Sequence, residues 1–144
     1  EVRAAIDDVR DDRTAVQRYA RGHEHLGAGR ERFETAWSEY EVGAWLGAVE
    51  HFDEAVAYFD AAGESLRSAE RFAESERVER ACQDAGDRAD NYRQAARWYA
   101  RAAEHYADGD EAMGDEYRAD AEGPHEAAST GAELPKPSTL FPEG

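Results

Sequence analysis

The 144-residue sequence predicts an all-α protein, an antiparallel bundle of four to five helices. Alanine, glutamate and arginine, which are good helix formers, dominate the first 123 residues. Apolar residues recur there at steps of three and four, the spacing that lines one side of a helix. Those 123 residues contain no proline, and all four prolines follow them, at positions 124, 135, 137 and 142.

The clearest helical pattern lies in residues 42–62. Val42, Val49 and Val56 are seven residues apart, a spacing that favours a partner helix lying nearly parallel or antiparallel. We therefore interpret this stretch as the one around which the other helices pack. Its expected inner stripe consists of Trp45, Val49, Phe52, Val56 and Phe59.

Glycines divide the chain into its expected helices, because glycine commonly ends a helix. The second segment could form one helix roughly 50 Å long, at 1.5 Å per residue, or two helices if Gly43 or Gly47 marks a turn. The expected breaks are Gly27 to Gly29, Gly63, Gly86 and Gly109-Asp110. The segments are 1–26, 30–62, 65–85, 87–108 and a short fifth helix through about residue 121.

The composition changes near the end of the chain. Gly123-Pro124 and the polar, proline-containing sequence that follows predict an extended tail. We therefore expect a helical domain over 1–122 and a tail over 123–144, with Leu140-Phe141 as its only apolar contact. The chain begins at Glu1, and we expect it to be a fragment or a processed product, with an upstream anchor or leader left open.

Similar residues recur at an offset of forty. Phe52, Ala55, Phe59 and Ala62 form an aromatic–alanine pattern that Tyr92, Ala95, Tyr99 and Ala102 repeat. Here the chain resembles the tetratricopeptide repeat family. That resemblance implies helical hairpins, as an alternative to the bundle, and protein–protein interaction without catalysis. The family's usual period is thirty-four and its closing proline is missing here.

The charge is strongly acidic. Thirty-three aspartates and glutamates oppose seventeen bases, which gives a net charge of −16, and Lys136 is the only lysine. Acid excess with little lysine resembles the proteins of halophilic archaea, in which molar salt screens the repulsion between carboxylates. This composition predicts a high-salt organism and favours a cytoplasmic location.

Several classes of function are disfavoured by what the sequence lacks. We expect no direct binding to nucleic acid, since no basic face is available to displace counterions. The single cysteine, Cys82, permits no intrachain disulfide, and no apolar run is long enough to cross a membrane. No phosphate-binding loop or catalytic motif is present, so we expect neither an enzyme nor a cofactor.

Histidines provide the alternative chemistry. Helical bundles can hold metals between facing helices, yet no Glu-x-x-His motif occurs in this sequence. His23 falls on an inner position, with Glu24 and His25 beside it. The alternative function is thus a metal- or small-ligand-binding bundle that uses His23, His25 and nearby acids.

The aromatic residues provide the leading hypothesis, because the sequence holds more of them than one narrow core can bury. The surplus forms either a second packing face or an exposed patch for a partner. We predict a non-catalytic interaction or scaffolding domain that binds a protein partner or self-associates. The expected binding surface consists of Tyr40, Trp45, Tyr58, Trp98 and Tyr117.

Overall fold

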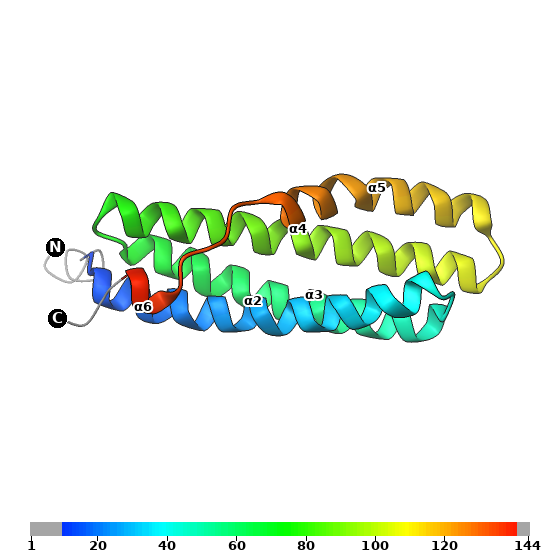
Figure 1. The fold of residues 1–144 in the computed structure, drawn as a ribbon, viewed down its shortest axis with the longest axis horizontal. Coiled ribbons are helices and arrows are strands. Elements are labelled where there is room, and N and C mark those ends of the chain that lie inside the picture. Colours follow the sequence, from blue (N-terminus) through cyan, green and yellow to red (C-terminus); the bar gives the residue numbers. More distant parts are fainter. Residues whose placement is uncertain (1–9, 141–144) are drawn as a thin grey trace, which may run out of the picture.

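The computed structural model describes residues 10–140, which form an elongated antiparallel bundle of helices (Figure 1). No strand is present in this part of the chain, so the predicted all-α bundle is confirmed. The elements are α2 (Asp12–Glu41), α3 (Trp45–Phe72), α4 (Glu76–Ala107), α5 (Glu111–Thr130) and the short α6 (Pro137–Leu140).

The helices pack in chain order. α2 packs on α3, α3 on α4 and α4 on α5, while α2 also touches α4. α2 and α5 thus both lie beside α4, and the chain after α5 returns along the bundle to reach α2 (Figure 1). This return places segments from opposite ends of the chain side by side.

The helix starts are set by polar side chains. The carboxylate of Asp11 accepts a hydrogen bond from the Arg13 amide at 3.0 Å. Ser75 and Asp110 do the same for Val78 and Met113, at 3.3 and 3.2 Å. Such caps satisfy amides that have no partner within the helix, which explains why α2, α4 and α5 begin where they do.

The stretch 30–62 forms parts of two helices rather than one. Gly43 adopts a φ of +79°, a conformation that ends α2 and that side chains disfavour. Val42 is therefore in the turn and 80% exposed, so the seven-residue spacing that it shares with Val49 and Val56 does not place it against a partner helix. The expected inner stripe is confirmed: Phe52 and Phe59 are buried, and Trp45, Val49 and Val56 pack against the core.

Most of the glycines expected to end helices lie inside them. Gly27, Gly29, Gly63 and Gly86 are all helical, and only the break at Gly109-Asp110 is confirmed. The reason at Gly29 is close packing, because a Cβ atom there would lie 2.6 Å from a ring carbon of Phe59. This glycine lets α2 approach α3. The sequence alone does not distinguish a glycine that allows close packing from one that ends a helix.

The expected end of the last helix near residue 121 is also wrong. α5 continues through Pro124 to Thr130. Residues 131–136 then cross the bundle, and the hydroxyl of Tyr19 donates to the Pro135 carbonyl at 2.6 Å. Leu140 is buried, as its expected role as an apolar contact requires, whereas Phe141 lies outside the described residues.

Alanine is the commonest residue in the core, and a few large rings fill the space between the alanine faces. Phe33 lies at the centre, with ring centroids 5.3 Å from Phe52 and 5.5 Å from Tyr92. Tyr99 stacks on Phe52 at 5.6 Å. Small residues bring the helices close together and the rings fix their register.

Candidate functional site

The five aromatic residues of the expected binding surface lie in three separate places. Tyr40 and Trp45 belong to a cluster at the α2–α3 turn, and Tyr58 lies alone on α3. Only Trp98 and Tyr117 lie together and partly exposed across two helices, with ring centroids 5.6 Å apart. The five residues therefore do not form the single binding surface that was expected.

The cluster at the α2–α3 turn is a packing feature. Tyr40 is only 6% exposed and lies 5.3 Å from Trp45, which itself stacks on Tyr106 at 4.7 Å. Within the part of the chain that the structure describes, the Tyr40 hydroxyl has no hydrogen-bond partner. Tyr40 closes this end of the core and cannot present its ring to a partner.

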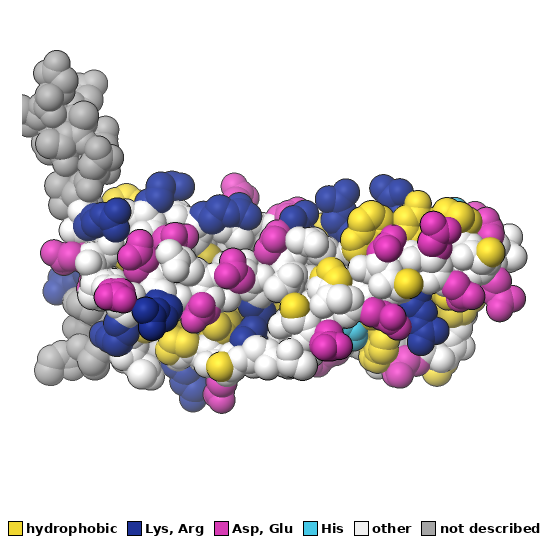
Figure 2. Space-filling model, turned by 90° about the horizontal axis from the view of Figure 1, so that it is seen from above, with side chains coloured by type: hydrophobic (Ala, Val, Ile, Leu, Met, Phe, Trp, Pro, Cys, Tyr) yellow, Lys and Arg dark blue, Asp and Glu magenta, His cyan; other side chains and the backbone are white. Residues whose placement is uncertain are grey.

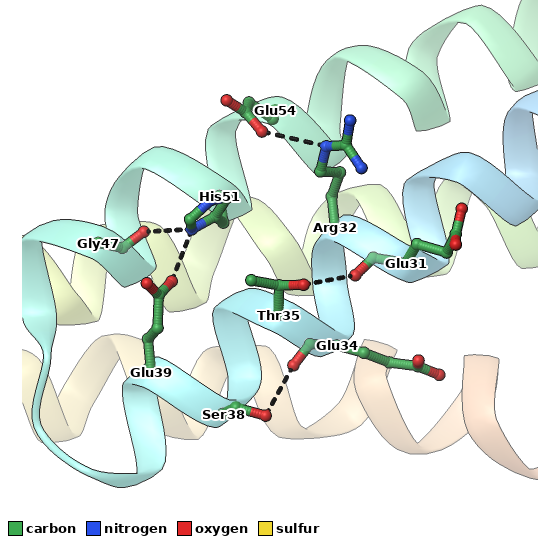
Figure 3. Close-up of polar contacts among 9 residues, drawn as sticks. All are labelled: Glu31, Arg32, Glu34, Thr35, Ser38, Glu39, Gly47, His51 and Glu54. Carbon is green, nitrogen blue, oxygen red and sulfur yellow. Dashed lines mark hydrogen bonds and ion pairs between the residues drawn. The ribbon is translucent and has the colours of Figure 1, made fainter.

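Polar contacts join α2 to α3 along the outside of this hairpin (Figure 3). His51 lies 2.6 Å from the Glu39 carboxylate through Nδ1, which is also 3.0 Å from the Gly47 carbonyl. The hydrogen bond to Glu39 raises the pKa of His51. Arg32 forms an ion pair with Glu54 at 3.2 Å, and its guanidinium lies 5.5 Å from the Tyr58 ring.

Trp98 and Tyr117 are the start of a stack that crosses from α4 to α5. Tyr117 also lies 5.3 Å from the His105 ring, at an angle of 16° between ring planes. All three side chains are partly exposed, so this stack has one face in the core and one face in solvent. Such amphipathic rings are enriched at protein interfaces.

Arginines line the surface next to this stack. A cavity of about 280 Å³ is lined by Trp98 together with Arg93, Arg97 and Arg101, which follow one another at steps of four along α4. Steps of four place side chains on one side of a helix. We name these three arginines with Trp98 and Tyr117 the arginine–aromatic face.

The charge of this face differs from that of the chain as a whole. Residues 91–103 contain three arginines and no aspartate or glutamate, although the net charge is −16. Arg93 is neutralised by Asp90 at 2.7 Å and approaches Asp60 at 3.6 Å. Arg97 and Arg101 are exposed and form no ion pair with any residue of 10–140.

Figure 2 shows how side chains of each kind are distributed over one face of the molecule. Hydrophobic side chains gather toward one end, and Lys or Arg side chains lie beside them. Acidic side chains lie over the whole of this view, among the hydrophobic ones as well. A combination of apolar area and arginine, as in the arginine–aromatic face, is typical of binding surfaces.

His23 and His25 do not come together with further metal ligands. Over the described residues, no three His, Cys, Asp or Glu side chains are grouped so that they could hold an ion. His23 instead lies with its ring 5.9 Å from that of Tyr19 and lines a cavity between α2, α4 and the segment after α5. The metal alternative therefore has no ligand set in this region.

His125 is a partly buried histidine that the sequence analysis did not single out. Tyr99 is hydrogen-bonded to its Nδ1 at 2.7 Å, and the rings of Phe33 and Trp37 each lie 5.1 Å away. Burial lowers the pKa of His125. The sequence did not point to His125 because this residue follows Pro124, where an extended tail was expected.

The remaining reactive group is inert. Cys82 is buried, and burial raises the pKa of its thiol to about 12, which leaves no thiolate near neutral pH. In the described part of the chain, no helix combines the length and apolarity needed to cross a membrane.

Comparison with known proteins adds no relative: no family model, no curated protein and no solved structure matches this chain. Its geometry alone therefore carries the functional argument.

Proposed function

We propose that this chain is a non-catalytic protein-binding domain and that its arginine–aromatic face binds an acidic segment of a partner protein. The observation that carries the proposal is the pair of unneutralised arginines, Arg97 and Arg101, beside the partly exposed Trp98. Exposed cations that remain unpaired in an acid-rich chain are well suited to an acidic partner.

The partner's chemistry follows from charge and from packing. Arginine forms bidentate hydrogen bonds with carboxylates, so an acidic segment gains both attraction and orientation on this face. The rings of Trp98 and Tyr117 supply apolar area that such a segment covers with its own apolar side chains. The acidic remainder of the surface repels the same partner, which limits binding to this face.

A photo-crosslinking amino acid in place of Gln94, which lines the same cavity, tests the proposal in extracts of the source organism. The crosslinked segment of the captured protein is expected to be rich in aspartate and glutamate. Binding of the purified partner is then measured with the double variant Arg97→Glu/Arg101→Glu. We expect its affinity to fall at least about tenfold, as lost charge-assisted contacts require.

The control is Arg21→Glu, a charge reversal at an exposed arginine of α2. It is expected to leave affinity unchanged, and changing the partner's acids to arginine should restore binding to the double variant. A crosslink to a neutral or basic segment would contradict the proposal, as would equal losses in the double variant and the control. Crosslinking only to a second copy of this chain would replace it with self-association.

We further propose that the domain works in concentrated salt, as a protein of a halophilic archaeon. The support is the net charge of −16 together with a single lysine. Lowering KCl from about 3 M to 0.1 M lengthens the Debye length from below 3 Å to about 10 Å, which strengthens repulsion between the carboxylates. We expect the thermal midpoint, followed by circular dichroism, to fall over this range; a constant midpoint would contradict the proposal.

A further inference from the structure

A groove lies between α2 and α5 over the surface of α4. Its end is closed by residues 131–136, which run from α5 back toward α2 (Figure 1). Two hydrogen bonds fix this linker: Tyr19 donates to the Pro135 carbonyl, and Arg88 donates to the Ala132 carbonyl. The linker and the helices enclose a cavity of about 470 Å³.

Three basic side chains from three elements line this cavity. Arg30 comes from α2, Arg88 from α4 and Lys136, the only lysine of the chain, from the linker. Glu133 is the one acidic residue among those that line it, and none of the three cations is in an ion pair with another described residue. The three cations thus bring positive charge to one cavity, which attracts an anion that enters it.

The groove continues into an aromatic region. A second cavity of about 150 Å³ shares Arg30, Tyr92 and Ser129 with the first. Its other walls are formed by Phe33, Trp37 and His125, with one acid, Glu34. The groove therefore has a cationic half and a mainly aromatic half, which meet at the residues that both cavities share.

We propose that this groove binds a small organic anion, with its carboxylate or phosphate group among Arg30, Arg88 and Lys136. The flat apolar part of the ligand lies in the aromatic half, against Tyr92 and Trp37. The Ser129 hydroxyl, which both cavities share, offers a further hydrogen bond to the ligand. The cationic cavity, at about 470 Å³, lies within the range of about 300–1,000 Å³ that is common for ligand pockets, and the aromatic cavity beside it measures about 150 Å³.

This site is distinct from the arginine–aromatic face. The two share no residue: the groove is formed by α2, α4, the end of α5 and the linker, whereas the face lies on α4 and on Tyr117 of α5. The proposal for the groove therefore holds or fails independently of the proposed protein partner.

Isothermal titration calorimetry with phenyl phosphate, phenylacetate and benzyl alcohol tests the proposal on the whole chain. The first two probes carry an aromatic ring with a phosphate or a carboxylate, and the third carries a ring without charge. We expect one saturable site for at least one anionic probe, and binding at least about tenfold weaker for benzyl alcohol. The anionic probe that binds more tightly identifies the preferred anionic group.

The variants are Lys136→Gln and Arg30→Gln, with Arg71→Gln, an exposed arginine of α3, as the control. Both Lys136 and Arg30 are exposed, so their replacement leaves the core intact, and circular dichroism verifies folding. Each is expected to weaken binding of the anionic probe about tenfold, while the control keeps it. The proposal is overturned by the absence of saturable binding, by equally tight benzyl alcohol, by retained affinity in both variants, or by an equal loss in the control.

Discussion

Two groups of basic side chains lie on this acidic protein, and they are built differently. The arginine–aromatic face takes Arg93, Arg97 and Arg101 from consecutive turns of one helix. The groove gathers single cations from α2, α4 and the linker. The face keeps its charges as long as α4 is helical, whereas the groove exists only when distant segments are packed together.

This difference separates two kinds of binding surface. A row of arginines along one helix suits a long segment of another protein that lies beside it. A groove between several elements can bring groups from distant parts of the chain to one small molecule. Variants that disturb the packing should therefore affect the groove and spare the face, unless they disrupt the whole bundle.

The largest effect is expected for Gly29→Val, which disturbs the framework that both regions share. Its Cβ atom would lie 2.6 Å from the buried Phe59 ring, so α2 must move away from α3. We expect a loss of about 3 kcal/mol in the free energy of unfolding, measured by chemical denaturation, as for severe overpacking. Gly27→Val is the matched control, because nothing lies within 4 Å of its Cβ position.

The control should change stability by less than about 0.5 kcal/mol, as is usual for surface substitutions. Equal destabilisation by the two variants would show that the loss at Gly29 does not come from the contact with Phe59.

The next effect is expected for Leu140→Ala, which separates the groove from the face. Leu140 is buried, and Arg77 donates to its carbonyl at 2.7 Å, so α6 holds the end of the linker. We expect this variant to lose about 2 kcal/mol in the free energy of unfolding, measured by chemical denaturation. Hydrogen exchange should become faster over residues 131–140 and stay unchanged around Arg97 on α4. Faster exchange along α4 as well would show that the two regions are not independent.

A smaller effect is expected for Tyr99→Phe, beneath the aromatic half of the groove. The change removes the hydrogen bond to His125 and should cost about 1 kcal/mol in stability. Tyr40→Phe is the counterpart at a neighbouring ring, 5.4 Å from that of Tyr99, whose hydroxyl has no partner among the described residues. It should leave stability unchanged or raise it, since an unsatisfied buried hydroxyl is removed. Equal losses in both variants would contradict this assignment.

The same contrast explains what the sequence could predict. The inner stripe of α3, including Phe52 and Phe59, follows from helical spacing, as does the all-α bundle. Trp98 and Tyr117, two of the five residues of the expected binding surface, lie together and partly exposed, while their binding to a partner stays a prediction. These features depend on one helix or on neighbours in the chain, where periodicity carries the information.

The helix ends and the groove could not be predicted in the same way. Gly29 reads as a helix end, but its role depends on the Phe59 ring of another helix. Pro124 reads as the start of a tail, although α5 continues beyond it. The groove could not be predicted for both of these reasons. Arg30 and Lys136 line it together only because α2 continues past Gly29 and the chain after α5 returns toward α2.

The smallest effect on stability is expected at His51, which belongs to neither of the two basic regions. Its hydrogen bond to Glu39 raises the pKa of His51 above the unfolded value near 6.5. The charged pair therefore stabilises the fold fully below that unfolded value and loses its contribution as pH rises through the folded pKa. His51→Gln should cost less than about 1 kcal/mol at pH 5.5 and almost nothing at pH 8.5, as partly exposed ion pairs do.

Thermal unfolding of the wild type and of His51→Gln at the two pH values measures this difference, with His25→Gln as the control on α2. His25 forms no ion pair with a described residue, so its variant should track the wild type at both pH values. A His51→Gln deficit that grows toward pH 8.5 would reverse the expected sign and show that neutral His51 is the form that the fold prefers. In that case the contact with Glu39 would be an ordinary hydrogen bond of a neutral histidine and not an ion pair.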